Sequence, residues 1–269
     1  MQPRAIILRA AGTNCDLETA HAFELAGATS QIVHVNRLVE NPSRLKEFQI
    51  LAIPGGFSYG DDIAAGRILA NQLVHHLGDA LERFRSLGKP IIGICNGFQV
   101  LIKTHLFTGP AGGSEPPHPV GTLTHNDCGR FVDRWVRLAP RSRKCIWTKG
   151  LRDFEAPVAH AEGKFVPANE PSRRFLWEDD RVALVYVQPD GSPAGGQFPH
   201  NPNGSVDDIA GVCDGSGLVL GLMPHPERHV TPLQHYAWTR LTALPLEAAG
   251  LGLFRNAVDY VRQAVGVGV

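Results

Sequence analysis

The sequence predicts an α/β protein in which a central, mostly parallel β-sheet carries helices on both faces. Strand-like and helix-like segments alternate four times within about the first 105 residues, which is the pattern of a parallel sheet covered by helices. Residues 90–94 are rich in isoleucine, as expected of a strand that is buried on both faces. Glycines follow the first helical segment and the long second one, where helices commonly end.

Each expected element follows from its own pattern. Short apolar runs predict strands in the first half at residues 5–8, 31–35, 48–53 and 90–94. Apolar side chains at helical spacing predict helices at residues 17–25, 67–87 and 97–105. After a Gly- and Pro-rich loop at 108–119, shorter and more antiparallel strands are expected at 130–138, 156–159, 182–187 and 218–222. A closing helix is expected at 251–265. Since no linker divides the chain, we expect a single domain over residues 1–269.

Composition excludes several classes of function. Lys and Arg number 26, as do Asp and Glu, so the basic excess of a nucleic-acid-binding protein or a polybasic membrane surface is absent. No apolar run approaches the roughly 18 residues that span a bilayer, and the N-terminus does not resemble a signal peptide. The five cysteines show no metal-binding spacing. These features predict a cytoplasmic protein without a metal site.

The segment around Cys95 has the pattern of a nucleophile at a sharp turn. A buried strand leads directly into Gly-Ile-Cys-Asn-Gly and a helix is expected to follow, as in the elbow where hydrolases place a serine. A helix N-terminus stabilises a thiolate, and the N–H group of Asn96 is available to an oxyanion. The alternative is a small buried cysteine that ends a strand, and this segment alone leaves the two about equal.

Two further segments lie at strand ends. Gly55-Gly56-Phe57 follows the third expected strand, so its N–H groups could face an anion at the same sheet edge as Cys95, although an ordinary turn is the simpler interpretation. His225 and Glu227 stand two residues apart between prolines. In an extended segment both would point to one side, and the carboxylate could orient the imidazole.

A fourth group of polar residues is less specific. It consists of His160 with Glu162, and of a later segment with Asn201, Asn203 and Ser205. The amides and hydroxyls could hold a polar substrate. From spacing alone, an ordinary Asn-Pro-Gly turn is favoured for the later segment.

Taken together, these motifs resemble those of a known family. Cys95, His225 and Glu227, in this order after a Gly-Gly loop, resemble class I glutamine amidotransferases. The segments PGGFSYGD, GICNGFQ, HAEGKF, NPNGSVDDIAG and MPHPER are similar to those of glutaminase subunits of phosphoribosylformylglycinamidine synthase, and Asn14-Cys15-Asp16 also fits. The resemblance runs from about residue 5 to 228. It implies a flavodoxin-like three-layer sandwich.

The resemblance implies a role for each matching residue. Cys95 would be the nucleophile, His225 its base, and Glu227 the group that orients His225. The backbone N–H groups of Gly56 and Asn96 would form the oxyanion hole. Weaker candidates for glutamine contacts are the following residues: Gly55, Phe57, Gln99, His160, Glu162, Asn201, Asn203 and Ser205.

The resemblance also implies partners. Glutamine would be hydrolysed to glutamate and ammonia, and a synthetase would use ATP and the ammonia to convert formylglycinamide ribonucleotide to its amidine in purine synthesis. This chain has no GxxxxGK[ST] loop, so ATP and Mg²⁺ are expected on a large synthetase subunit, joined by a small bridging subunit, with no cofactor in this chain. Residues 62–65 depart from the family pattern, and the 108–119 loop looks longer than usual.

Two alternatives remain open at this stage. A free-standing cysteine hydrolase of the same fold would need no synthetase, although the HAEGKF and NPNGSVDDIAG segments argue against it. A non-catalytic scaffold would keep the fold alone, but the intact set of Cys95, His225 and Glu227 argues against that.

Overall fold

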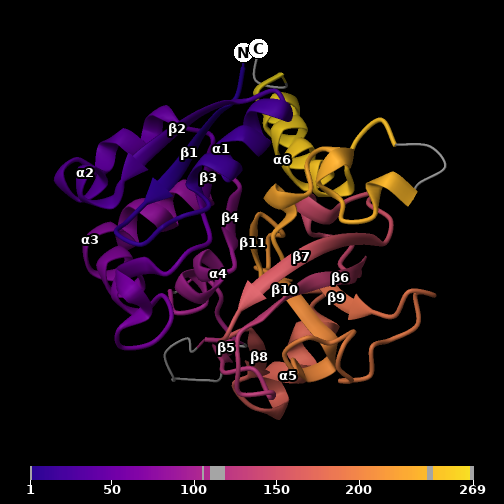
Figure 1. Ribbon diagram of the computed structural model, residues 1–269. Helices are drawn as coiled ribbons and strands as arrows, with labels where there is room; N and C mark the ends of the chain where they lie inside the picture. Colours follow the sequence, from indigo (N-terminus) through magenta and orange to yellow (C-terminus); the bar gives the residue numbers. More distant parts are fainter. Residues whose placement is uncertain (1, 105, 110–118, 241–244, 267–269) are drawn as a thin grey trace.

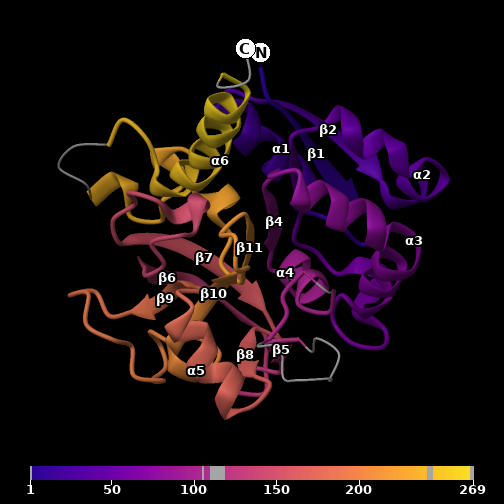
Figure 2. The same ribbon diagram turned by 180° about the vertical axis from the view of Figure 1, so that it is seen from behind.

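The computed structural model describes residues 2–104, 106–109, 119–240 and 245–266. Within them, one mixed sheet has the strand order β2-β1-β3-β4-β11-β10-β9-β6-β7. Its first five strands pair in parallel and the remaining pairs are antiparallel. The parallel half and the antiparallel half lie side by side in both views (Figures 1 and 2).

The parallel half has the predicted alternation of strands and helices. Its strands are β1 (Arg4–Arg9), β2 (Thr29–His34), β3 (Ile50–Ile53), β4 (Ile91–Ile94) and β11 (Val219–Leu222). Its helices are α1 (Asp16–Leu25), α2 (Val35–Glu40), α3 (Arg67–Ser86), α4 (Asn96–Leu101) and α6 (Ala249–Gly266). α1 packs against α6, while α3 packs against α4 and α2. The fold class is therefore the predicted one, with helices on both faces of the sheet.

The antiparallel half continues the sheet and adds a small ribbon. Its strands are β10 (Ile209–Cys213), β9 (Val182–Val187), β6 (Val132–Pro140) and β7 (Phe154–His160). The ribbon pairs β5 (Gly121–Thr124) with β8 (Lys164–Pro167), and α5 (Glu170–Glu178) follows it. Short 3₁₀ helices connect the elements: η1 (Pro42–Glu47), η2 (Ser58–Asp61), η3 (Ile146–Thr148), η4 (Val206–Asp208), η5 (Pro226–Arg228), η6 (Pro232–Gln234) and η7 (Trp238–Arg240).

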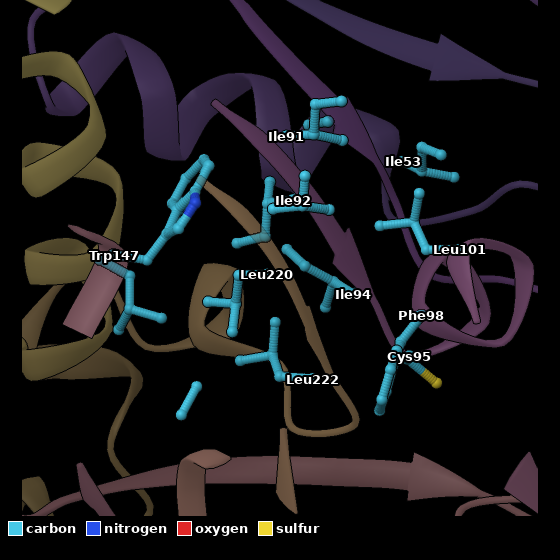
Figure 3. Close-up of a cluster of buried hydrophobic side chains, with 14 of the residues drawn as sticks. Ile53, Ile91, Ile92, Ile94, Cys95, Phe98, Leu101, Trp147, Leu220 and Leu222 are labelled. Carbon is cyan, nitrogen blue, oxygen red and sulfur yellow. The ribbon is translucent and has the colours of Figure 1, made fainter. Parts of the chain in front are cut away.

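The core lies along the central strands β4 and β11. Ile92 and Leu220 are fully buried in one cluster with Trp147 of η3, as Figure 3 shows. The Trp147 indole N–H donates to the Leu218 carbonyl at 2.8 Å, so its polar atom is paired. Burying an isoleucine or leucine side chain contributes roughly 1.5–3 kcal/mol. This packing holds rigid the two strands whose ends carry Cys95 and His225.

The sequence predicted some elements better than others. The strand at 182–187 coincides with β9, whereas the strand expected at 31–35 ends at His34 because α2 begins at Val35. The α-helices and strands that were not predicted are α2, β5, β8, α5 and β10. The helix expected at 97–105 is shorter in the structure, since α4 begins at Asn96 and ends at Leu101. Residue 105 and most of the loop expected at 108–119 lie outside the described residues. Among those described, no helix is long and apolar enough to cross a membrane.

Candidate active site

Cys95 occupies the sharp turn between β4 and α4. Its backbone has φ 52° and ψ −108°, a strained conformation for a residue with a side chain. Its N–H donates to the carbonyl of Leu222 at 2.8 Å, which ties the turn to the end of β11. A Cβ atom at Gly97 would collide with the backbone carbonyl of Ile53, so α4 can approach β3 only with glycine there. The turn therefore has the predicted elbow geometry.

His225 and Glu227 form a buried pair at the end of β11. His225 Nδ1 lies 2.6 Å from Glu227 Oε1, and neither residue is more than 2% exposed. The backbone forms the 3₁₀ helix η5 at Pro226–Arg228, so the expected extended segment was wrong although the expected contact is present. Within the described structure, His225 Nε2 has no hydrogen-bond partner. This nitrogen is free to exchange a proton.

The electrostatics favour a protonated His225 when its neighbours are charged. Burial lowers the pKa of His225, but the negative charges of Glu227 and Cys95 raise it more, so this pKa lies well above its usual value. A histidine with a raised pKa stays protonated until a neighbouring group becomes a stronger base than the imidazole. The pair suits a base that becomes an acid within one catalytic cycle.

The Gly55-Gly56 loop brings Cys95 and His225 together. The position that a Cβ atom of Gly55 would occupy lies 2.8 Å from His225 Cε1 and 3.5 Å from Cys95 Cβ. Only glycine at position 55 therefore leaves room for both His225 and Cys95 to pack against this loop. Among the described residues, the N–H groups of Gly56 and Asn96 donate to no protein acceptor. They are therefore available to an oxyanion.

Two hollows meet at Cys95 and share Gly56, Phe57 and Ala159. The first, which we call the Gln99 hollow, has about 50 Å³ and is lined further by Asp61, Ala65, Gln99, His160, Ala161 and Glu162. The second, which we call the Arg228 hollow, has about 180 Å³ and is lined further by Asn14, Cys15, Phe131, Asp133, His225 and Arg228. A hollow of about 980 Å³ beside α5 contains none of the three candidate catalytic residues.

The Gln99 hollow holds several of the predicted glutamine contacts. Gln99 Nε2 donates to the carbonyl of Glu162 at 2.6 Å, and Gln99 Oε1 accepts from Asn96 Nδ2 at 2.9 Å. The carboxylate of Glu162 accepts from the N–H of Ala65 at 3.4 Å. The bonds of Gln99 and Ala65 to Glu162 connect α4 and the segment before α3 with the segment after β7. The hollow therefore has polar walls whose positions are fixed by the protein itself.

His160 lies in the same wall as a neutral imidazole. Its Nδ1 lies 3.1 Å from Asn126 Oδ1. Burial, and then the charge of His225, lower the pKa of His160 to about 3. At neutral pH this residue cannot act as an acid, so its contribution is a hydrogen bond and shape.

The segment with Asn201, Asn203 and Ser205 forms the ordinary turn that its spacing favoured. Asn201 Nδ2 donates to the carbonyl of Ser205 at 2.9 Å, and Asn203 Nδ2 donates to the carbonyl of Gly163 at 2.8 Å. All three residues are buried, and none lines either hollow at Cys95. The structure therefore places them behind the site, where they support the loop that carries His160.

Among the residues that were not proposed as site residues, four polar or aromatic ones with notable positions line the Arg228 hollow: Cys15, Phe131, Asp133 and Arg228. Arg228 Nη2 lies 3.2 Å from Cys15 Sγ, and its Nε donates to Glu18 at 3.2 Å. The sequence positions of two of the four could have indicated the site, because Cys15 follows the first strand and Arg228 follows Glu227 directly. Phe131 and Asp133 gave no such indication, because only the tertiary fold brings β6 to this place.

One group of metal-ligating atoms lies here. Within the described residues, ligand atoms of Cys15, His225 and Glu227 lie within 4.8 Å of one another. His225 Nδ1 is already paired with Glu227, and the guanidinium of Arg228 contacts the Cys15 sulfur. A fixed positive charge in this position opposes a second cation. His225 and Glu227 are therefore better suited to a catalytic triad with Cys95 than to a metal centre with Cys15.

This geometry agrees with comparisons to known proteins. The family model for the CobB/CobQ-like glutamine amidotransferase domain matches residues 2–261. The chain therefore belongs to the glutamine amidotransferases. It is 46% identical over 261 residues to "Phosphoribosylformylglycinamidine synthase subunit PurQ" of Dehalococcoides mccartyi, covering 97% of this chain and 98% of that one. The subunit of the same name from Treponema denticola is 44% identical over 86% of this chain and 89% of its own length.

A solved structure gives the same result. A chain of PurLQS from Thermotoga maritima superimposes with a TM-score of 0.72 at 30% identity, covering 97% of this chain and 100% of that chain. Within the glutamine amidotransferases, the chain thus belongs to the PurQ subunits of phosphoribosylformylglycinamidine synthase, an enzyme of purine biosynthesis. The resemblance seen in the sequence and the fold it implied are both confirmed.

Proposed function

We propose that Cys95, His225 and Glu227 hydrolyse glutamine, and that the chain delivers the ammonia to a synthetase subunit of the same enzyme. The observation that carries this proposal is the buried His225–Glu227 pair. The imidazole of His225 adjoins the strained turn at Cys95, and its Nε2 has no hydrogen-bond partner within the described structure. A nucleophile, its base and an orienting carboxylate are the parts that acyl transfer requires.

The reaction proceeds in two halves. Cys95 Sγ attacks the amide carbon of glutamine while His225 takes the thiol proton. His225 then gives this proton to the amide nitrogen, the C–N bond breaks, and ammonia leaves a glutamyl thioester on Cys95. In the second half, His225 takes a proton from water, the hydroxide attacks the thioester carbon, and glutamate leaves as Cys95 regains the proton. Glu227 holds the imidazole in place and stabilises its charged form.

The negative charge that develops on the carbonyl oxygen is stabilised by backbone groups. The N–H groups of Gly56 and Asn96 have no protein acceptor within the described chain, and Gly56 lines both hollows beside Cys95. Such fixed donors lower the barrier because they need no reorganisation as charge develops. The Gln99 hollow then receives the glutamine, with Phe57, Gln99, His160 and Glu162 in its lining and Gly55 beside Cys95.

The partners follow from the relatives. The Thermotoga maritima structure is one of PurLQS, and we propose a similar assembly here, with a large synthetase subunit and a small bridging subunit. ATP and Mg²⁺ bind the synthetase, which inserts the ammonia into formylglycinamide ribonucleotide. Support comes from the absence of a GxxxxGK[ST] loop in this chain. Such a complex would work in the cytoplasm, where its substrates are made.

The decisive variant is Cys95→Ala, assayed in the assembled enzyme. Glutamine-dependent amidine formation should disappear, while synthesis from added ammonium chloride should continue at the wild-type rate, because only the nucleophile is lost. Cys128→Ala is the matched control, since Cys128 is a free and exposed thiol. Retention of glutamine-dependent synthesis by Cys95→Ala would refute the catalytic assignment.

A further inference from the structure

Cys15 is a second thiol at the active site, and the catalytic cycle described above gives it no role. It directly precedes α1 and is only 1% exposed. Cys15 and Cys95 both line the Arg228 hollow. A second thiol in the same hollow as a nucleophilic cysteine is a potential partner for a disulfide bond.

The Gly55-Gly56 loop brings these two cysteines close to each other. The position of a Cβ atom at Gly55 would lie 3.2 Å from Cys15 Sγ and 3.5 Å from Cys95 Cβ. Both cysteines therefore converge on the same side of this loop. The N–H of Cys15 also donates to the carbonyl of Gly55 at 3.2 Å, which fixes its backbone there.

The other three cysteines are placed differently. Cys145 and Cys213 are buried, and Cys128 is exposed. None of these three lines either hollow at Cys95. Cys15 is thus the cysteine that the described structure brings to the same hollow as Cys95.

The charges around Cys15 suit a thiol that attacks second. Burial raises the pKa of the Cys15 thiol, so it is uncharged at rest. Arg228 Nη2 lies 3.2 Å and His225 Nδ1 4.0 Å from its sulfur. These groups stabilise the negative charge that develops on the sulfur during an attack. The first reaction with an oxidant falls to Cys95, an order that rests on its proposed function as the nucleophile.

We propose that Cys15 is the resolving cysteine for Cys95, and that the two form a reversible disulfide when a peroxide oxidises the active site. The sulfur of Cys95 takes one oxygen from hydrogen peroxide, the O–O bond breaks, and water leaves a sulfenic acid. Cys15 Sγ then attacks Cys95 Sγ. The S–S bond forms, the S–O bond breaks, and the hydroxide leaves as water with the Cys15 proton. Two thiols are oxidised, and one peroxide is reduced to two waters.

The disulfide would protect the catalytic sulfur. A second peroxide converts a sulfenic acid to a sulfinic acid, which a thiol reductant cannot reverse. A disulfide blocks this step and returns to two thiols by exchange with a dithiol. The Arg228 hollow has about 180 Å³, which is room for several molecules the size of water at roughly 30 Å³ each, so hydrogen peroxide can reach both sulfurs.

The test maps the bonds that hydrogen peroxide forms in the full chain. The Cys128→Ala chain is treated with peroxide, its remaining thiols are blocked, and it is digested without reductant for mass spectrometry. A peptide that links Cys15 to Cys95 should appear, and dithiothreitol should abolish it. In the Cys15→Ser, Cys128→Ala chain, Cys95 should instead gain two oxygens that dithiothreitol does not remove.

Activity gives the second measurement. The assembled enzyme is treated with peroxide and then with dithiothreitol, and glutamine-dependent synthesis is expressed relative to the same protein without treatment. The enzyme with Cys15 should regain several-fold more of its own activity than the enzyme with Cys15→Ser. Equal recovery would overturn the protective role of Cys15.

The peptide map decides the proposal even if Cys15→Ser does not fold. Absence of the Cys15–Cys95 peptide would overturn it, whether Cys95 gains oxygen instead or stays unmodified. A disulfide between Cys145 and Cys213 alone would also overturn it. The proposed function fails separately, because it is tested by the Cys95→Ala variant without any oxidant.

Discussion

His225 and His160 are two buried imidazoles that line neighbouring hollows, and their partners give them opposite properties. His225 faces the carboxylate of Glu227, which favours the charged ring. His160 faces the amide oxygen of Asn126, which cannot compensate a buried charge to the same degree. The first can therefore take up and release a proton during catalysis, while the second stays neutral.

The neutral His160 makes the protein sensitive to acid. Its pKa is about 3 in the folded chain against about 6.5 when unfolded, so below about pH 6.5 the unfolded state binds more protons. The free energy of unfolding should fall as pH decreases from about 6.5 toward 3. At about pH 5 the loss from this residue is roughly 2 kcal/mol.

We expect His160→Gln to remove much of this acid dependence. The measurement is urea unfolding of wild type and variant at several pH values between neutral and acid, with exposed His21→Gln as the control. The difference in unfolding free energy between wild type and His160→Gln should shift in favour of the variant as pH falls. A difference that is constant with pH would mean that the pKa of His160 is the same in the folded and the unfolded chain, which would contradict the prediction.

At the scale of elements, the site depends on how closely α4 approaches β3. Gly97 lies at the beginning of α4, with no room for a Cβ atom beside the backbone of Ile53. Gly78 lies within α3, and nothing in the described structure lies within 4 Å of its Cβ position. The two glycines therefore offer a matched pair of helix positions with opposite surroundings.

Alanine should have opposite effects at these positions. Gly97→Ala should lower the free energy of unfolding by roughly 1–3 kcal/mol, because the added methyl group forces backbone apart in a packed core. It should also impair glutamine hydrolysis by displacing Cys95. Gly78→Ala should raise stability by about 0.5–1 kcal/mol, since alanine is the better helix former. Equal effects of both substitutions in urea unfolding would contradict this account of the elbow.

The same elements show why some features were predictable from sequence. β4 was expected because an isoleucine-rich run ends in a glycine turn. The Gly55-Gly56 loop and Cys95 were placed at one sheet edge because both follow strands, whereas His225 was joined to Cys95 through the family resemblance. Short β10, with alanine and glycine within Ile209–Cys213, lacks such a signal and pairs only through the tertiary fold. α5 did have one, since Asn169 caps it and Pro171 stands in its first turn.

At the scale of the molecule, the site lies at the junction between the two halves of the sheet. Cys95 and His225 follow the adjacent parallel strands β4 and β11. The opposite wall, from Ala159 to Glu162, comes from the end of antiparallel β7. The second wall, with His160 and Glu162, was indicated only through the family resemblance, since the placement of β7 depends on its pairing with β6 far along the sheet.

This junction is narrow in the single chain. The Gln99 hollow has about 50 Å³, room for one or two waters at roughly 30 Å³ each, so it must widen before glutamine enters. The segment that carries Asp61 and Ala65 forms one wall, and Tyr59 and Asp61 there have positive φ values of 55° and 53°. Ile63 between them and Ala65 is 71% exposed, so a partner can reach this wall.

We therefore expect the chain alone to hydrolyse glutamine poorly. A partner that holds the 61–65 wall open supplies free energy that the isolated chain must otherwise spend at every binding event. If opening the 61–65 wall in the isolated chain costs about 1.4 kcal/mol, kcat/KM for glutamine falls about tenfold relative to the complex, with most of the effect in KM. The measurement compares glutamate release by the chain alone and by the complex with ATP and formylglycinamide ribonucleotide, with Cys95→Ala subtracted in each case. Equal rates would identify a free-standing amidase whose hollow widens without help, and a change confined to kcat would place the activation at the oxyanion loop instead of at this wall.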